Sequence, residues 1–348
     1  MQYASTIEKR SRRLKTGMAR KIRQSEIARI SGVSVSTVSR VMNGLPGISA
    51  EVREHVQRAA ESLGLKLETP LRTIASSVLV LAPMTVLSSH AGQFHTDILS
   101  GVSRAAGAAG VSLTCMPLGD TVETESALAR ADGVILLSVD TRETIEAAQR
   151  LAKPVVLLNA LANADDDAVD VVLPDNFGGG AKACRFLTEL GHDRIACLMH
   201  SERETIKERF AGARSILGDG APCEYVPLSL SVDDLSGKLK ALLDRTGFTA
   251  LLCSNDITAI AAMQALGRLG LSVPGDVSIV GFDDLPPAAL SQPPLTTIRI
   301  DREALGGAAF RQLLARIENH AEPAMRQILS TELVERHSTA PPAQKAQS

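Results

Sequence analysis

The sequence predicts a small N-terminal all-α head followed by an α/β core of two lobes, each built on a parallel sheet. Three observations lead to this prediction. The chain has 348 residues, enough for two or three domains of ordinary size. Residues 1–72 hold 14 Lys and Arg against 6 Asp and Glu, whereas the rest of the chain is acidic. Helical apolar spacing fills the basic part, and short apolar runs alternate with Ala-rich amphipathic segments in the acidic part.

The composition narrows the functional class. Hydrophobic residues make up 45% and charged residues 22%, as in a globular protein with a sizeable core. Aromatic residues make up 3%, with no Trp and two Tyr, which disfavours nucleic-acid binding by aromatic stacking. The five Cys are scattered without metal-type spacing, so we expect reduced thiols, no metal site and no cofactor. No apolar run reaches about 18 residues and no signal peptide is recognisable, which predicts a cytoplasmic protein without membrane association.

The head begins with a basic extension over residues 1–21, which by itself could be a solvated tail. Residues 22–67 are predicted to form three helices. Within residues 24–43 the apolar positions have the spacing of two short helices that pack together: Ile27, Ile30, Val33, Val38 and Val41. Gly32 supplies the positive φ that the turn needs, and Ser34 supplies a cap for the second helix.

The second helix carries small polar and basic side chains on its predicted outer face, among them Ser36, Ser39, Arg40 and Asn43. A helix that enters the major groove of DNA needs such a face, because Arg can bond bidentately to guanine and hydroxyls bond phosphates. A third helix is predicted after the cap Ser49, with Val52, Val56, Ala59 and Leu63 at helical spacing. The pattern indicates a helix-turn-helix that binds double-stranded DNA; the alternative is a plain three-helix bundle.

The runs SGVSVSTVSRVMNGLPGIS and EVREHVQRAAESLGL resemble the DNA-binding head of the lactose repressor and galactose repressor family of bacterial transcription regulators. The resemblance implies that Val35, Ser36 and Arg40 read bases. It also implies that a second set contacts the DNA backbone: Ser34, Thr37, Ser39, Asn43 and Ser49. Because Val35 offers only apolar contact with a thymine methyl group, we expect Arg40 to supply most of the direct specificity.

Residues 68–76 form the predicted hinge or linker, where the chain departs from the family's pattern. Leu65, Leu67 and Glu68 stand where Tyr, Pro and Asn are usual, and the segment is shorter. Leu71 resembles the family's leucine that inserts into the minor groove, but the preceding proline disfavours a continuous helix. Minor-groove insertion of Leu71 and a plain linker therefore stay open as alternatives.

Residues 77–335 are predicted to form the core, which binds an effector and dimerises. Buried strands are expected at 77–83, 111–117, 133–138, 154–159, 169–174, 194–200, 248–254 and 277–282. Helices are expected at Asp97–Ala109, Thr121–Arg130, Thr141–Leu151, Arg203–Leu217, Leu235–Arg245 and Ile257–Leu269. The first lobe should comprise 77–190 and 298–320, with a helix near Arg302–Ile317, and the second 191–297 and 321–335, with a last strand near Gln327–Glu335. Residues 336–348 are expected to be a disordered tail without leucine heptads, which favours a homodimer over a tetramer.

In parallel sheets a ligand binds at the carboxyl ends of the strands, here between the lobes. The core also resembles the same family, whose body is similar to periplasmic sugar-binding proteins, on ADGVILL, DNFGGG, ERFAG and SNDITAIAAMQALGRLGLSVPGDVSIVGFDD. The resemblance implies effector contacts by Phe94, Asp175, Arg209, Asn255 and Asp283. Asp256 is expected to cap the following helix instead.

These features predict a sequence-specific transcriptional regulator, a repressor as most members of the family are, that binds operator DNA as a homodimer under the control of a small effector. Asp, Asn and Arg side chains favour a sugar or sugar derivative; a purine stacked on Phe94 is the alternative. A solute-binding component of a transporter would fit the core but not the basic head. A sugar-processing enzyme is disfavoured by the lack of a nucleophile elbow, a phosphate loop or opposed carboxylates. We therefore expect no catalytic residues.

Overall fold

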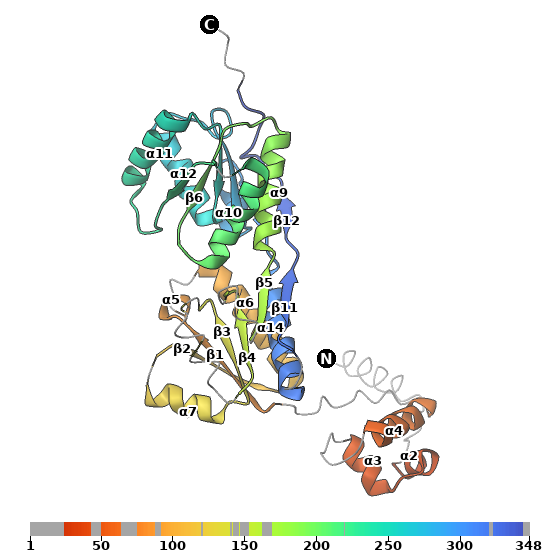
Figure 1. Cartoon of the computed structure of the whole chain (residues 1–348). Helices are drawn as coiled ribbons and strands as arrows, with labels where there is room; N and C mark the ends of the chain where they lie inside the picture. Colours follow the sequence, from red (N-terminus) through yellow and green to blue (C-terminus); the bar gives the residue numbers. More distant parts are fainter. Residues whose placement is uncertain are drawn as a thin grey trace, which may run out of the picture. The chain divides into compact units, whose positions relative to one another are not determined.

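The computed structural model describes residues 24–42, 50–63, 75–87, 92–119, 121–139, 141, 146, 153–161, 169–218, 220–319 and 323–343. The chain divides into two compact units, Met1–Ile74 and Ala75–Ser348 (Figure 1). The predicted extension over residues 1–21 and nearly all of the predicted helix Thr141–Leu151 lie outside the described residues.

The first unit contains the three helices α2 (Gln24–Ser31), α3 (Val35–Met42) and α4 (Ala50–Ser62). Their apolar faces share one small core, in which Ile27, Val38 and Val56 are fully buried. Gly32 adopts the predicted positive φ, +69°, in the turn between α2 and α3. Ile30, predicted to be buried, is 44% exposed, because the buried stripe of α2 is centred on Ile27 and Ala28 and leaves Ile30 at its edge.

The first lobe of the second unit contains a six-stranded sheet in the order β11-β5-β4-β3-β1-β2, with every adjacent pair parallel. Its strands are β1 (Ser77–Ala82), β2 (Ser112–Pro117), β3 (Gly133–Leu137), β4 (Val155–Leu158), β5 (Asp170–Pro174) and β11 (Arg326–Leu329). Val78 and Val80 face helices α6 (Gly92–Ala109) and α14 (Arg302–Glu318), whereas Leu79 and Leu81 face α7 (Val122–Arg130). The short helix α5 (Met84–Leu87) follows β1.

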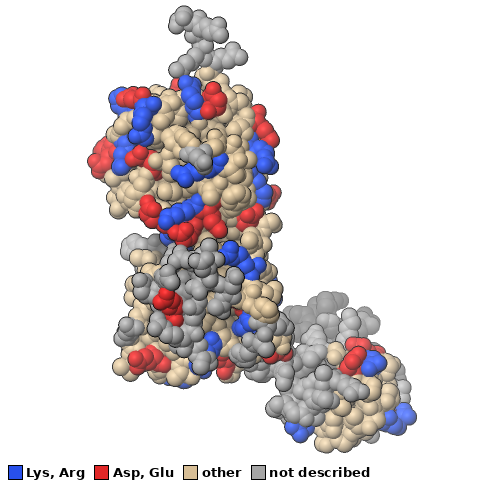
Figure 2. Space-filling view, viewed as in Figure 1, with Lys and Arg blue, Asp and Glu red and all other residues tan. Residues whose placement is uncertain are grey.

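The second lobe contains a second six-stranded sheet, in the order β12-β10-β9-β8-β6-β7. Its strands are β6 (Ile195–Met199), β7 (Cys223–Tyr225), β8 (Ala250–Cys253), β9 (Ser278–Asp283), β10 (Thr296–Arg299) and β12 (Glu332–Val334). Only the edge strand β12 is antiparallel to its neighbour, β10. The helices α9 (Asn176–Glu189) and α10 (Glu204–Leu217) pack on one face, and α11 (Val232–Thr246) and α12 (Asp256–Arg268) share the core on the other. Lys, Arg, Asp and Glu side chains are interspersed over the viewed surface of this lobe (Figure 2).

Two pairs of helices pack with their backbones in direct contact. A Cβ atom at Gly101 of α6 would clash with the carbonyl of Glu303 in α14, and one at Gly306 of α14 would clash with the carbonyl of Ile98 in α6. Gly180 of α9 and Gly212 of α10 form the equivalent contact in the second lobe. The α6–α14 and α9–α10 pairs lie side by side in Figure 1 as well. Glycine at these positions permits an approach that no other residue allows.

Two details of the predicted lobe boundaries are wrong. Helix α9 belongs to the second lobe, because β5 ends at Pro174 and Asp175 directly caps α9, which packs on α10. Residues 326–329, predicted for the second lobe, form β11, which pairs with β5 of the first sheet; only β12 returns to the second. In the described residues the chain therefore crosses between lobes after β5, after β10 and after β11.

The predicted disordered tail is ordered over its first half. Ser338 is fully buried: its hydroxyl accepts a hydrogen bond from the Thr296 amide (2.8 Å) and donates one to the Ile279 carbonyl (2.6 Å). His192 and Ser278 also bond to the backbone of Ala340. The segment is ordered because its backbone groups and hydroxyls form hydrogen bonds with β9 and β10. Its Pro- and Ala-rich composition gives no sign of these bonds.

Candidate functional site

The first candidate site is the exposed face of α3 in the helical unit. The Ser34 hydroxyl accepts a hydrogen bond from the Thr37 amide at 3.1 Å and so caps α3, as predicted. Ser34, Val35, Ser36 and Arg40 are exposed, with Val35 47% exposed despite being apolar, while Thr37 and Ser39 are half-buried. The predicted contacts Asn43, Ser49 and Leu71 lie outside the described residues. The described part of the motif thus presents a helix with short polar side chains and one Arg on its open face.

The second candidate site is a cavity of about 480 Å³ in the second unit, a volume within the usual range of small-molecule sites. The first lobe lines it with Gly92, Gln93, Phe94, His95 and Asn159. The second lobe contributes polar side chains, His200, Arg203, Arg209, Asn255 and Asp283, among apolar ones such as Leu228 and Leu285. Most of these residues follow strands or begin helices, the positions at which parallel sheets expose polar groups.

Arg209 of α10 organises the second-lobe side of this cavity. Its Nε donates to Asn176 Oδ1 at 3.0 Å, and its Nη1 donates to the Ser254 carbonyl at 2.5 Å and to Asp283 Oδ1 at 3.1 Å. The guanidinium carbon lies 3.8 Å from the centre of the Phe282 ring, which adds a cation–π contact. A planar guanidinium bonded in several directions is rigid. Arg209 therefore fixes the orientation of the Asp283 carboxylate.

Burial shifts the ionisation of this pair. Asp283 is 5% exposed, and desolvation raises its pKa above the ordinary value, while Arg209 opposes the shift. Desolvation likewise lowers the pKa of Arg209, opposed mainly by Asp283. Asp283 also has φ of +106°, rare for a residue with a side chain. Such strain persists only where surrounding contacts hold it.

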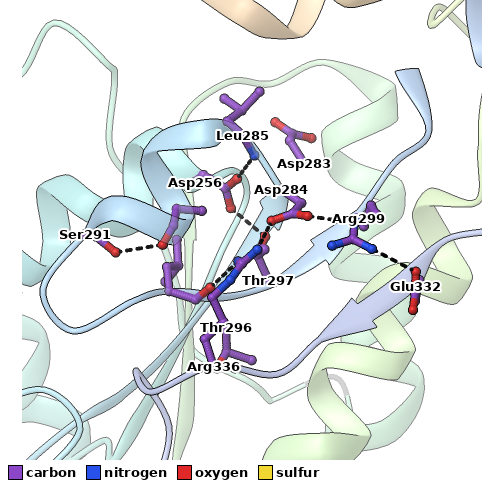
Figure 3. A network of polar contacts seen from close by, with 12 residues as sticks. Asp256, Asp283, Asp284, Leu285, Ser291, Thr296, Thr297, Arg299, Glu332 and Arg336 are labelled. Atoms are coloured by element: carbon purple, nitrogen blue, oxygen red, sulfur yellow. Dashed lines mark hydrogen bonds and ion pairs between the residues drawn. The ribbon is translucent and has the colours of Figure 1, made fainter. Parts of the chain in front are cut away.

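The turn after β9 is held by groups from several elements, which Figure 3 shows together. Asp284, with φ of +52°, accepts hydrogen bonds from Arg299 Nε at 2.7 Å and from Arg336 Nη2 at 2.6 Å. Asp256, predicted to cap α12, instead accepts from the Leu285 amide (2.6 Å) and the Thr297 hydroxyl (2.5 Å). The cap is Asn255, whose side chain accepts from Thr258. Complete burial raises the pKa of Asp256 to about 8.

A polar network lines the first-lobe wall. Asn159 Nδ2 donates to Ser138 Oγ at 3.0 Å, and His95 Nε2 lies 3.2 Å from the same hydroxyl. Ser138 and Asn159 both have positive φ, 55° and 52°, at the ends of β3 and β4. Asn159 is 3% exposed, yet its Oδ1 has no hydrogen-bond partner among the described residues. An unpaired buried acceptor is costly unless a ligand supplies a donor.

Two basic side chains of the second lobe, Arg203 and His200, line the cavity. Arg203 donates from Nη2 to the Asn159 carbonyl at 2.8 Å, which joins the two lobes beside the cavity. His200 Nδ1 lies 2.7 Å from the Ser254 hydroxyl. Burial, together with the nearby Arg209 and Arg203, lowers the pKa of His200 to about 4. His200 is therefore neutral at pH 7, with one ring nitrogen to donate and one to accept.

The structure brings together four of the five predicted effector residues: Phe94, Arg209, Asn255 and Asp283 line the cavity. It does not bring Asp175 there, because the Asp175 carboxylate accepts from the Gly178 amide at 2.8 Å and caps α9. The prediction missed the following lining residues: His95, Asn159, His200 and Arg203. Asn159 and His200 are the last residues of the predicted strands 154–159 and 194–200, so the strand-end rule would have found them.

The cavity's arrangement suits reversible binding. Its side chains offer hydrogen-bond donors and acceptors around apolar walls, which fits a hydroxylated ligand.

Among the residues that the structure describes, no three His, Cys, Asp or Glu side chains are placed to hold a metal ion. Within the same residues, no helix combines the length and the apolar character needed to cross a membrane.

Comparison with known proteins gives matches to both units. Residues 25–66 match the model for bacterial regulatory proteins of the lacI family, and residues 184–339 match that for a periplasmic binding protein-like domain. The HTH-type transcriptional regulator MalR of Streptomyces coelicolor is 33% identical over 336 residues, which cover 91% of this chain and 96% of MalR.

Solved structures of regulators are similar over nearly the whole chain. The complex of the transcriptional regulator CelR with cellobiose has a TM-score of 0.66 at 29% identity, covering 91% of this chain and 100% of CelR. The lac repressor dimer bound to its operator and an anti-inducer has a TM-score of 0.65 at 28% identity, covering 90% of this chain and 98% of the repressor chain.

Proposed function

The chain belongs to the lacI family of bacterial regulatory proteins and is a DNA-binding transcriptional regulator. From this premise we propose that it acts in the cytoplasm as a homodimeric repressor, and that a sugar or sugar derivative in the cavity between its lobes controls its affinity for the operator. We propose no catalytic step.

The unpaired Oδ1 of Asn159 is the observation that supports a hydroxylated effector most directly. This atom is buried in the wall of the cavity and needs a hydrogen-bond donor. From the second lobe, Asp283 supplies a carboxylate held in place by Arg209. Acceptors from two different lobes suit the hydroxyl groups of a sugar, each of which both donates and accepts. The cellobiose bound by the related CelR supports a saccharide here.

The two walls belong to different lobes, so an effector bound to both changes the equilibrium between lobe arrangements. An effector shifts that equilibrium only if it binds the arrangements with different affinity, and the coupling to DNA is then reciprocal. Couplings of this kind typically amount to about 5- to 150-fold in affinity.

On DNA, we propose that Val35, Ser36 and Arg40 read bases from the exposed face of α3. Ser34, Thr37, Ser39, Asn43 and Ser49 would then contact the backbone, and Leu71 would insert into the minor groove. In a dimer two such helices reach successive major grooves, which predicts a pseudo-palindromic operator. The operator-bound lac repressor dimer supports this arrangement.

The experiment is a footprint of the full-length protein on the DNA upstream of its own gene, repeated at fixed salt with a panel of sugars, sugar phosphates and nucleosides. We expect a protected site with two symmetric halves and a change in affinity of at least about fivefold with one class of compound. Protection that is absent, or that every compound leaves unchanged, would contradict operator binding or effector control respectively.

A further inference from the structure

We infer that Arg302 is a positioning residue that ties the Asp283 turn of the second lobe to helix α6 of the first, and so sets the separation of the lobes. This inference rests on the proposed effector response, because that response depends on how the two lobes are arranged.

Arg302 occupies the first turn of α14, directly after the chain crosses between lobes. Asp301 caps this helix by accepting from the Ala304 amide at 2.9 Å, which fixes the backbone of Arg302. A cation is electrostatically unfavourable at a helix N-terminus, because the helix dipole is positive there. Its side chain is nevertheless only 12% exposed. The partners of the guanidinium must therefore compensate for both its position and its burial.

Those partners lie in both lobes. On one side, Nε donates to Asp97 Oδ2 of α6 at 2.9 Å, within the first lobe. On the other side, Nη1 donates to the backbone carbonyl of Asp283 at the end of β9, in the second lobe, with a weaker contact of 3.4 Å to the Asp284 carbonyl. Because the guanidinium is planar and rigid, these bonds hold α6 and the Asp283 turn at a fixed distance.

The link reaches the cavity at both ends. Gln93, which lines the first-lobe wall, donates from Nε2 to Asp97 Oδ1 at 2.5 Å. Asp283 lines the second-lobe wall and bonds to Arg302 through its backbone carbonyl. A continuous path of hydrogen bonds thus runs from Gln93 through Asp97 and Arg302 to Asp283.

The second-lobe end of this path has little freedom to adjust locally. The side chain of Asp284 is held by Arg299 and Arg336, and the Leu285 amide is held by Asp256 (Figure 3). A displacement of Arg302 relative to this turn therefore moves the whole lobe and cannot be absorbed by a change in one side chain. For the same reason, loss of Arg302 should free the lobes to change their separation.

The test measures the distance between the lobes in the full-length protein without DNA or effector. Spin labels are placed at Glu123→Cys on α7 and Gln264→Cys on α12, both exposed, with Cys115 and Cys223 replaced by serine. Labelled chains are diluted into excess unlabelled chains so that only distances within one chain are read. The dominant separation in the parent protein serves as the reference. In Arg302→Gln, we expect the population at that separation to fall about tenfold relative to the populations at other separations, because one charge-assisted hydrogen bond is lost.

Arg104→Gln is the matched control. Arg104 pairs with Glu303 at 2.7 Å, so it joins the same helices α6 and α14, and it makes no ion pair with the described residues of the second lobe. Its distance distribution should match that of the parent. Asp97→Asn weakens the same link at its first-lobe end and should give the distance distribution of Arg302→Gln. Asp97→Glu keeps the carboxylate and should give the distribution of the parent.

An unchanged distribution in both Arg302→Gln and Asp97→Asn would overturn the inference, as would an equal change in Arg104→Gln. Because no DNA is present, such a result would leave operator binding untouched. Conversely, a missing footprint together with altered distances would overturn the proposed function and leave the role of Arg302 intact.

Discussion

Arg209 Nη1 lies 3.1 Å from Asp283 Oδ1, and the two side chains are 5% and 8% exposed. Removing one member of a buried pair leaves the other charge uncompensated. We expect Arg209→Ala to lower the free energy of unfolding by about 3–5 kcal/mol in urea denaturation. The double variant with Asp283→Asn should lose less than the sum of the single losses, because no unpaired charge remains. Lys240→Ala breaks an exposed ion pair on α11 and is the control; it should change the free energy of unfolding little. An equal loss of stability in Arg209→Ala and Lys240→Ala would show that burial gives the Arg209–Asp283 pair no special role.

The buried carboxyl of Asp256 makes stability depend on pH. Its pKa is about 8 in the native chain and about 3.8 when unfolded, so the native state holds a proton that the unfolded state releases between these values. Stability from this group therefore falls as pH rises to about 8, by roughly 1.4 kcal/mol per pH unit.

The variant Asp256→Asn isolates this dependence, since an amide keeps a similar shape without titrating. Below about pH 6.5 the lowered pKa of His200 acts in the opposite direction, so the comparison is made from pH 6.5 to 8. We expect the stability of the variant relative to the parent to increase steadily over that interval. Parallel curves for the two proteins would show that Asp256 is ionised in the native state.

Two glycines on the same helix should respond oppositely to alanine. At Gly101 the added methyl group meets the backbone of Glu303, so the helices must separate, at a cost of about 1–3 kcal/mol. At Gly107 nothing lies within 4 Å, and alanine should stabilise by about 0.5–1 kcal/mol. Thermal unfolding of both variants checks this. A destabilised Gly107→Ala, or a neutral Gly101→Ala, would argue against backbone contact between α6 and α14.

The C-terminal segment should contribute to stability through Ser338. Ser338→Ala leaves the buried Thr296 amide without its acceptor, which should cost about 1–3 kcal/mol in urea denaturation. Glu335→Ala, an exposed position in the same segment, is the control. If both substitutions prove neutral, the segment does not contribute to the folded core.

Arg40 should determine base preference. With the operator and single-base variants in fluorescence anisotropy at constant salt, Arg40→Ala should lose about 1–3 kcal/mol of discrimination at one position in each half-site. Arg58→Ala, on α4 and paired with Glu54, should leave base preference intact. A uniform loss over all sequences would instead indicate that Arg40 contacts phosphate.

The sequence was sufficient to predict most of the fold because burial leaves a clear pattern. The eight predicted strands are present, and their near-continuous apolar runs reflect burial on both faces of the sheets. Strands β7 and β10 were not predicted, since they are short and partly polar, and the single last strand expected near residues 327–335 is divided into β11 and β12. Thr296 and Thr297 are fully buried in β10, where hydrogen bonds to Ser338 and Asp256 satisfy them. Such partners are distant in sequence and cannot be inferred from local pattern.

The site was less predictable, because strand-end position does not determine how a side chain is used. Asp175 directly follows β5 and Asp283 ends β9, but Asp175 caps a helix whereas Asp283 lines the cavity. Asp256 follows Asn255 directly, yet Asn255 is the cap and Asp256 holds a turn. These assignments depend on backbone directions that only the folded chain fixes.

The backbone contacts at Gly101, Gly306, Gly180 and Gly212 bear on how this protein could acquire a new effector. Most cavity-lining residues lie at strand ends and in first helical turns, and they take no part in these backbone contacts. These lining residues can therefore be exchanged during evolution or in a designed library without repacking either lobe. Arg209 is the exception, because its own carbonyl lies against Gly180. A library that varies Phe94, His95 and Asn159 while keeping Arg209 should thus retain folded members with altered ligand preference.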